Sequence, residues 1–242
     1  MNQYLDQTNL FKRYKELDVI WDKNDKWHYY VYIQIKKYIR KTIRKNYITN
    51  NSRLLNAGSG GQEYGLKFFN HIHLDIVDKR MKDKKNFVKA SIENIPFQDN
   101  SFDLIICVGS VINYCDALKA LSEFERLISK NGILIIEFES SLSFEYLFTM
   151  QFNSSASIVK TFYQGKEEKI WVYSEKYIKE LLKINNFVII EENRFHIFSS
   201  FIYRLTKNIN FSTKFIWLDC IIKKFKFPGK FATNIIFTCK KI

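Results

Sequence analysis

Several residue types are scarce in this chain of 242 residues, and each scarcity excludes a class of protein. Two prolines and eight glycines exclude a collagen-like repeat and a Pro/Gly-rich linker. The four cysteines are widely spaced and form no Cys-x-x-Cys pair, which argues against a zinc knuckle, a redox motif and a disulfide scaffold. We therefore expect reduced and mostly buried thiols.

Long apolar runs are also missing. A membrane-spanning helix needs about 20 consecutive apolar residues, and no segment of the chain approaches that length. The first residues, MNQYLDQTNLFKRYKELD, are too polar for a secretory signal peptide. We expect a cytoplasmic protein without a membrane span.

Acidic residues are outnumbered, with 25 Asp and Glu against 38 Lys and Arg, which gives a formal net charge of +13. A surplus of this size suggests a nucleic-acid partner or an anionic membrane surface. The surplus is mostly Lys, however, and the chain also contains 22 Phe and 14 Tyr, a mixture that an AT-rich genome produces without selection for a polyanion. We favour this compositional explanation, and the charge alone leaves a polyanionic partner open.

Strands and helices are expected to alternate through most of the chain, as in a doubly wound α/β sheet. The first fifty residues look helical and basic, and apolar residues spaced four apart predict a helix from Trp27 to Lys45. From residue 53 onward, short apolar runs alternate with helical stretches. The expected strands are Leu54 to Ala57, His71 to Asp75, Phe87 to Ala90, Phe102 to Val108, Ile133 to Phe138, Phe187 to Glu191 and Thr233 to Cys239.

Other elements are expected between and after these strands. A helix capped by Asp116 should continue to Asn131-Gly132, and a hairpin from Ser157 to Tyr173 should turn at Gln164-Gly165. A further helix is expected from Ser174 to Asn186. We therefore predict a helical N-terminal extension or lid over residues 1–50. A main domain should span 51–242, with cap insertions at about 141–173 and 194–230.

The sharpest motif is LLNAGSGGQEYG, in which a short strand leads directly into a glycine loop. Glycines at a strand-to-helix turn let the backbone approach a ligand closely. Glu63 stands where a dinucleotide fingerprint needs its third glycine, and the Gly-Lys-Ser/Thr ending of a phosphate-binding P-loop is absent. Asp75 follows Gly58 by about seventeen residues, where a carboxylate can accept both ribose hydroxyls. Loop and acid together predict a ligand with an adenosine but no pyrophosphate.

Four motifs, LLNAGSGG, HLDI, VKASIENIPFQDNSFDLIICVGSVINY and ISKNGILIIEFES, stand in this order over about residues 53–140. In sequence and spacing they resemble the class I S-adenosylmethionine-dependent methyltransferases, in particular type 11-like domains that act on small molecules. The resemblance implies a Rossmann-like seven-stranded sheet with the last strand antiparallel. It also implies S-adenosyl-L-methionine as cofactor and S-adenosyl-L-homocysteine as product.

The same resemblance implies the cofactor-binding residues. Gly58 and Gly60 would pass under the methionine part of the cofactor, and Asp75 would hold the ribose. The other implied contacts are Asn56, Ala57 and Ser59 beside the loop, Ile76 on one adenine face, Ser91 and Ile92 at the adenine edge, and Val108 and Ser110 at the methionine and the substrate entrance.

Two positions depart from the family pattern. Asn56 stands where the first strand commonly ends in an acid, and Ser91 replaces an acid often found near the adenine amino group. Both side chains can form hydrogen bonds, but neither supplies negative charge against the ammonium and sulfonium of the cofactor. Glu63 is a candidate to compensate.

Methyl transfer from a sulfonium is an in-line displacement, so the protein mainly has to align the reacting atoms. A general base is needed only if the acceptor must lose a proton early, and no fixed catalytic signature is expected. The catalytic residues are therefore unknown, with Tyr114, Glu139 and His28 as candidates. Asn113 and Tyr30 are weaker candidates for facing the site, whereas His196 is expected to pack in the core.

A metal site is not expected. His71, His73 and Asp75 alternate along one expected strand and therefore face the same side, formally two imidazoles and a carboxylate. The ribose role already uses Asp75, however, so we predict that the protein binds no metal.

We predict an enzyme that transfers a methyl group to an oxygen or nitrogen of a small or medium-sized metabolite, in a biosynthetic pathway. An RNA (nucleic-acid) methyltransferase stays open because of the +13 charge, and a non-catalytic cofactor-binding protein because of Asn56 and Ser91. The aromatic and basic segment from Phe215 to Phe227 suggests peripheral contact with an anionic membrane. The acceptor and the oligomeric state are left open.

Overall fold

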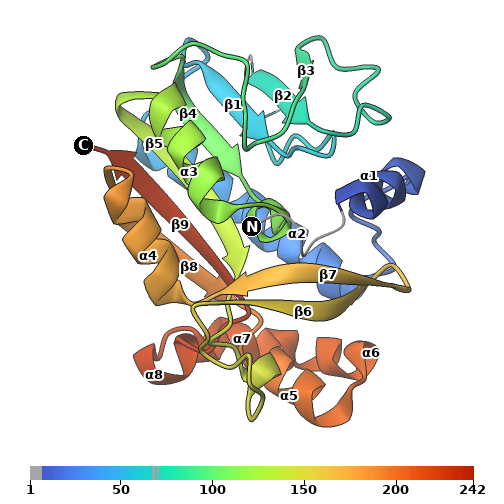
Figure 1. Ribbon diagram of the computed structural model, residues 1–242. Coiled ribbons are helices and arrows are strands. Elements are labelled where there is room, and N and C mark those ends of the chain that lie inside the picture. Colours follow the sequence, from blue (N-terminus) through green and yellow to red (C-terminus); the bar gives the residue numbers. More distant parts are fainter. Residues whose placement is uncertain (1–6, 67–68, 70) are drawn as a thin grey trace.

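The computed structural model describes residues 7–66, 69 and 71–242 of the chain (Figure 1). Two helices come first, α1 (Gln7–Glu16) and α2 (Lys26–Lys45). The carboxylate of Asp25 caps α2 by accepting a hydrogen bond from the backbone N–H of His28. The apolar residues spaced four apart form the buried face of α2, so the helix predicted from Trp27 to Lys45 is confirmed with one further residue at its start.

A seven-stranded sheet with the order β3-β2-β1-β4-β5-β9-β8 forms the centre of the molecule. The pairs among β1 to β5 are parallel, whereas β9 runs antiparallel to both β5 and β8. This confirms the predicted doubly wound sheet with an antiparallel last strand. The strands are β1 (Leu54–Ala57), β2 (His71–Asp75), β3 (Phe87–Lys89), β4 (Phe102–Cys107), β5 (Ile128–Glu139), β8 (Phe187–Phe195) and β9 (Asn234–Lys241).

Helices cover both faces of this sheet, and β4 shows why its sequence is a nearly continuous apolar run. Ile105 and Cys107 pack in the core shared with α3 (Ala117–Leu127) and α4 (Glu175–Ile184), whereas Leu104 and Ile106 pack in the core shared with α2. All four residues are completely buried. Burying a large aliphatic side chain contributes roughly 1.5–3 kcal/mol, so both faces of the strand favour apolar residues.

A hairpin and four short helices lie beyond the end of the sheet that is opposite β3 (Figure 1). The hairpin pairs β6 (Ala156–Tyr163) with β7 (Lys166–Tyr173), and its turn residues Gln164 and Gly165 both have positive φ, at 48° and 73°. Two consecutive positive φ values are typical of a type I′ turn, as the Gln-Gly pair predicts. The helices are α5 (Phe198–Thr206), α6 (Ile209–Ser212), α7 (Ile216–Ile222) and α8 (Lys226–Gly229), and the 3-10 helices are η1 (Val111–Tyr114), η2 (Phe144–Tyr146) and η3 (Thr213–Phe215).

Two predicted boundaries are wrong because strand pairing competes with local signals. Helix α3 ends at Leu127, and Asn131 with Gly132 lies inside β5, where the register against β4 shifts between Phe102 and Leu104. The Asn-Gly pair therefore accommodates an irregularity of the strand and does not end the helix. Strand β8 continues past Glu191 to Phe195 because it stays paired with β9 as far as Asn234.

The N-terminal segment is attached to the sheet through α2. The hydroxyl of Tyr38 accepts a hydrogen bond from Thr238 Oγ1 at 2.9 Å, and Thr42 Oγ1 lies 3.3 Å from Thr238 Oγ1. The predicted division into residues 1–50 and 51–242 stays a prediction, and residues 1–6 of it lie outside the described residues. Of the cysteines, Cys107, Cys115 and Cys239 are buried and Cys220 is exposed, all as free thiols.

Candidate functional site

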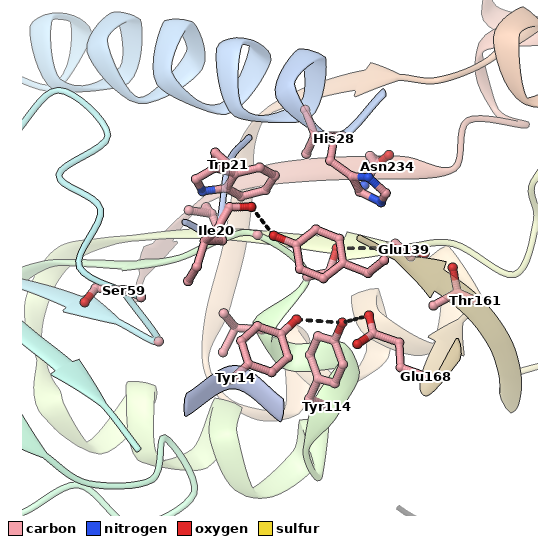
Figure 2. Close-up of a pocket in the computed structure, with 18 of the residues that line it drawn as sticks. Tyr14, Ile20, Trp21, His28, Ser59, Tyr114, Glu139, Thr161, Glu168 and Asn234 are labelled. Carbon is pink, nitrogen blue, oxygen red and sulfur yellow. Dashed lines mark hydrogen bonds between the residues drawn. The ribbon is translucent and has the colours of Figure 1, made fainter. Parts of the chain in front are cut away.

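A cavity of about 230 Å³ lies at the carboxyl ends of the central parallel strands, where α/β sheets bind their ligands. Loops after β1, β2, β3, β4 and β5 form one wall. Residues of the N-terminal segment, the β6–β7 hairpin and α5 form the opposite wall (Figure 2). The cavity therefore has a wall made by the sheet and a wall made by the cap.

The glycine loop of the sheet wall has the conformation that its sequence predicts. Gly58 and Gly60 have φ values of 67° and 54°, which non-glycine residues rarely adopt. A Cβ atom on Gly60 would also collide with Cδ1 of Ile20, and one on Gly58 would collide with the side chain of Val111. The loop can therefore carry no larger side chain without moving its neighbours.

Asp75 connects β2 to this loop. Its Oδ2 accepts a hydrogen bond from the backbone N–H of Gly60 and its Oδ1 one from Val77, both at 2.8 Å. Burial raises the pKa of Asp75 above its ordinary value, although both hydrogen bonds act in the opposite direction. The carboxylate is thus held in a fixed orientation on the cavity wall.

The structure places the predicted cofactor residues in two groups. Asn56 and Ala57 are buried in β1 behind the loop. The others all line the cavity, namely Gly58, Ser59, Gly60, Asp75, Ile76, Ser91, Ile92, Val108 and Ser110.

Neither Asn56 nor Glu63 lines the cavity. The side-chain amide of Asn56 donates to the carbonyl oxygen of Gln62 at 2.7 Å, while its Oδ1 is buried and accepts no hydrogen bond from the described residues. Asn56 lies behind the glycine loop and does not line the cavity, so this oxygen does not face a ligand there. Glu63 is not on the cavity wall and forms an ion pair with Lys84 at 2.9 Å. It therefore does not compensate for the missing acid.

Glu137 fixes the turn after β4. Its Oε2 accepts hydrogen bonds from the backbone N–H groups of Gly109 at 2.9 Å and Ser110 at 2.6 Å, and its Oε1 accepts one from Asn234 at 2.8 Å. The side chain is completely buried, and this burial raises its pKa against the effect of the three donors. The turn that borders the cavity thus depends on a carboxylate beneath it.

Glu139 is on the cavity wall two residues further along β5. Its Oε1 accepts a hydrogen bond from Ser110 Oγ at 3.0 Å. Burial, followed by the charges of Glu145 and Glu137, raises the pKa of Glu139 to about 8. A carboxyl group with this pKa can take up or release a proton near neutral pH.

Asn113 braces Glu139 and does not face the site. Its Oδ1 accepts a hydrogen bond from the backbone N–H of Glu139 at 3.1 Å, and its amide donates to the carbonyl oxygen of Trp171 at 2.6 Å. The side chain is completely buried. The prediction that Asn113 faces the site is therefore wrong, because its hydrogen bonds join β5 to the hairpin.

A chain of hydroxyl groups crosses the cap wall (Figure 2). Tyr14 donates to the hydroxyl of Tyr114 at 3.0 Å, and Tyr114 donates to Glu168 Oε1 at 2.6 Å. Arg13 Nε lies 3.3 Å from the other oxygen of Glu168. Burial raises the pKa values of both tyrosines well above the ordinary value, so they remain neutral donors. The predicted candidate Tyr114 thus connects α1 to β7 at the cavity.

The segment between α1 and α2 closes the cavity above the glycine loop. Arg80 donates hydrogen bonds to the carbonyl oxygens of Tyr14 at 2.8 Å, Leu17 at 2.7 Å and Gly60 at 3.1 Å, which joins the segment to the loop. The hydroxyl of Tyr163 donates to the carbonyl oxygen of Ile20 from the hairpin side. The segment is therefore held from both walls.

The two candidates on α2 have different surroundings. His28 lines the cavity, and its Nδ1 lies 2.6 Å from Asp25 Oδ2. Tyr30 does not line the cavity and packs edge-on against Phe195 and His196. His196 is completely buried, as predicted for a core residue, and burial lowers its pKa to about 3.

The two histidines of β2 contact each other and do not line the cavity. His71 Nε2 lies 3.0 Å from His73 Nε2, and burial lowers the pKa of His73 to about 4. Within the part of the chain that the structure describes, no three His, Cys, Asp or Glu side chains are grouped to hold a metal ion. The prediction of a metal-free protein stays a prediction.

Several cavity residues were not predicted. Glu137, which lies beneath the cavity wall, was also not predicted, although it had a local signal, because an acid inside the apolar run ILIIEFE points to the same face as Glu139. The others become neighbours only through the tertiary fold and have no local signal. They are Tyr14, Ile20, Trp21, Glu145, Tyr163, Glu168, Tyr203 and Asn234.

Known proteins with similar sequences include methyltransferases. A family model described as "Methyltransferase domain" matches residues 52–136. Uncharacterized protein MJ0638 of Methanocaldococcus jannaschii is 42% identical over 88 residues, which cover 34% of this chain and 39% of that protein. Demethylmenaquinone methyltransferase of Staphylococcus epidermidis is 30% identical over 122 residues, 48% of this chain and 50% of that enzyme. The matches thus span half or less of these relatives.

Solved structures show the same fold over the whole chain. The crystal structure of an S-adenosylmethionine-dependent methyltransferase from Clostridium acetobutylicum superposes with a TM-score of 0.60 at 15% identity. The superposition covers 97% of this chain and 98% of that one. At this level of identity the likeness establishes the fold.

Proposed function

Because the chain belongs to the class I S-adenosylmethionine-dependent methyltransferases, we propose that it methylates an oxygen or nitrogen of a small or medium-sized metabolite. The observation that carries this proposal is a cavity that both walls share. It joins the glycine loop and Asp75 on the sheet wall to Tyr114, Glu139 and Glu168 beside the cap. One chamber can therefore hold a methyl donor and an acceptor together.

The sheet wall fits S-adenosylmethionine, the methyl donor of this family. Gly58 and Gly60 present backbone at the cavity, with Val111 and Ile20 packed against them, and Asp75 presents two fixed oxygens to ribose hydroxyls. When bound, this cofactor supplies an electrophilic methyl carbon on a sulfonium.

Glu139 is the proposed proton acceptor. It touches Ser110, which borders the cofactor wall, and its raised pKa of about 8 suits it to receive the proton that an amine or hydroxyl loses on methylation. Tyr114 donates its only O–H to Glu168 and accepts from Tyr14, so its ring is held in place and would position the acceptor by contact. His28 would contact the acceptor from α2.

The charge inside the cavity favours a metabolite over RNA. Glu139, Glu145 and Glu168 all line the cavity, and the guanidinium of Arg13 forms an ion pair with Glu168. Burial raises the pKa of all three carboxyl groups, so they are partly protonated near neutral pH, and they offer a phosphate close to the methylated atom no positive charge. The +13 net charge therefore does not describe the surface that an acceptor meets.

Labelled cofactor tests the proposal. We would incubate the protein and methyl-labelled S-adenosylmethionine with a small-molecule extract and, separately, with total RNA. Label should appear in the small-molecule fraction and should be lost in Asp75→Ala. Asp78→Ala is the matched control, because Asp78 is half-exposed, pairs with Lys89 and lies outside the cavity.

The rival functions give different results in the same assay. Label confined to RNA would replace the metabolite with a nucleic-acid acceptor. Cofactor binding by calorimetry without labelling of either fraction would instead favour a non-catalytic binding protein. An Asp75→Ala variant that binds cofactor as tightly as the unchanged protein would contradict the assignment of the sheet wall.

A further inference from the structure

Large apolar side chains are exposed on the helices α5 to α8. Trp217, Phe225 and Phe227 expose 62, 60 and 70% of their surface, and Leu205 and Ile221 are also exposed. A globular protein normally scatters such residues singly. We name these five residues, together with the lysines described below, the basic aromatic face.

A row of phenylalanine rings connects the two ends of this region. Neighbouring ring centroids along the row lie between 4.7 and 6.2 Å apart. The rings therefore join the short helices into one packed layer, whose two ends, Phe227 and Phe211, are exposed. In order, the row contains Phe227, Phe231, Phe144, Phe201, Phe198, Phe215 and Phe211.

The charge of this region is almost entirely positive. Residues 198–230 contain seven Lys and Arg and one acidic residue, Asp219. Asp219 is completely buried, where it accepts hydrogen bonds from the backbone of Phe198 and from the backbone and hydroxyl of Ser199. The region therefore exposes no negative charge to a partner.

Exposed lysines stand beside the exposed rings. Lys214 Nζ lies 5.7 Å from the ring centroid of Phe211, and Lys230 Nζ lies 4.7 Å from that of Phe227. Lys223 and Lys224 are exposed next to Phe225. Within the described residues, no carboxylate forms an ion pair with any of these four lysines.

We propose that the basic aromatic face binds the surface of an anionic membrane. Membrane-surface helices place aromatic and aliphatic side chains among the acyl chains and lysines at the headgroups, and this face has both kinds of residue. Among the described residues no helix is long and apolar enough to cross a bilayer, so contact would be confined to one surface. This inference goes beyond the proposed function and does not depend on it.

Single-stranded nucleic acid is the competing polyanion, and the side chains favour lipid. Nucleic-acid surfaces combine positive charge with rings on which bases stack. Leu205 and Ile221 are exposed aliphatic side chains that offer no stacking surface, whereas acyl chains accept them as readily as Trp217. The mixture of exposed residue types therefore points to a membrane.

The helices beside the basic aromatic face also contribute to the cavity. Tyr203 of α5 and Ile209 of α6 line the cavity, and both helices belong to the same layer at the end of the molecule opposite β3 (Figure 1). Docking through this face would therefore bring the cavity wall made by α5 and α6 close to the lipid headgroups.

Vesicle sedimentation tests the inference with the full chain. The protein should sediment with vesicles of phosphatidylcholine and phosphatidylserine, and much less with vesicles of phosphatidylcholine alone. The double variant Lys223→Glu/Lys224→Glu should weaken partitioning at least about tenfold, because each lysine near an anionic surface contributes to binding. The matched control is Lys82→Glu/Lys85→Glu, which makes the same charge change at two exposed lysines between β2 and β3.

A second readout locates the contact and needs no charge variant. Lipids brominated on their acyl chains should quench part of the tryptophan fluorescence of the vesicle-bound protein, and Trp217→Phe should remove that part. The inference is overturned if anionic vesicles do not bind the protein, or if both double variants weaken binding equally. It is also overturned if Trp217→Phe leaves the quenching unchanged, or if single-stranded RNA binds through Lys223 and Lys224 while vesicles do not.

Discussion

Glu137→Ala should destabilise the protein by about 3 kcal/mol. The substitution leaves three donors without their acceptor, the partly buried backbone N–H groups of Gly109 and Ser110 and the buried side-chain amide of Asn234. Each unpaired donor costs roughly 1–3 kcal/mol, which gives a gross loss of about 3–6 kcal/mol with incomplete additivity. The raised pKa of Glu137 shows that burial disfavours its charged form, so removing the carboxylate offsets part of the loss.

Thermal unfolding measures this loss. For a chain of this size 1 kcal/mol shifts the Tm by about 2–4 °C, so Glu137→Ala should lower it by roughly 6–12 °C. Glu137→Gln is the control, because the side-chain oxygen of the new Gln can still accept from the N–H groups of the turn, and the side-chain amide of Asn234 can rotate to suit the Gln. This variant should lose about 1 kcal/mol of stability. If Ala and Gln variants melt together, or Ala melts within about 2 °C of the unchanged protein, the hydrogen-bond account of the turn is wrong.

Three further predictions concern the cavity walls. Gly60→Ala should abolish cofactor binding in calorimetry, because its Cβ would strike Ile20, whereas Gly165→Ala, with nothing within 4 Å of its Cβ, should bind normally. The methylation rate should rise through pH 8 as Glu139 ionises, and a Glu139→Gln variant with the same pH profile would refute its role as base. Folding raises the pKa of Glu139 from 4.5 to about 8, so the free energy of unfolding should fall as the pH rises between these two values. The fall should be smaller in Glu139→Gln. Urea unfolding of both proteins at the low and the high end of this pH range tests this. Tyr114→Phe should cost roughly 1–3 kcal/mol in urea unfolding, by breaking the hydroxyl chain, and an unchanged midpoint would count against that chain.

The sheet and its glycine loop could be predicted from the sequence because their signals are local. Strands β1 and β2 begin and end at the predicted residues, since each is a short apolar run followed at once by a ligand-facing loop. Gly58, Gly60 and Asp75 lie within this one stretch of chain, and their backbone geometry alone brings them together. Residues whose roles depend on adjacent chain are therefore predictable.

Other residues were misjudged because their partners are distant in sequence. Asn113 follows a strand, as site residues do, but it is buried by hydrogen bonds to Glu139 and to Trp171 of the hairpin. Glu168 stands in the charged run KEEKIW, which is typical of an exposed strand, yet it is only 8% exposed because Arg13 and Tyr114 converge on it. No local pattern distinguishes a buried carboxylate of this kind from a solvated one.

The two walls of the cavity therefore have different origins, and this separates two properties of the protein. The cofactor wall is built from one continuous part of the chain, residues 56–110, and its shape follows from strand order and glycine φ angles. The cap wall assembles from α1, the β6–β7 hairpin and α5, which are distant in sequence and contribute side chains such as Tyr14, Tyr163 and Tyr203. Substitutions in the cap can accordingly change which acceptor fits without disturbing Asp75 or the glycine loop. Cofactor affinity and acceptor choice should therefore vary independently among variants of this chain.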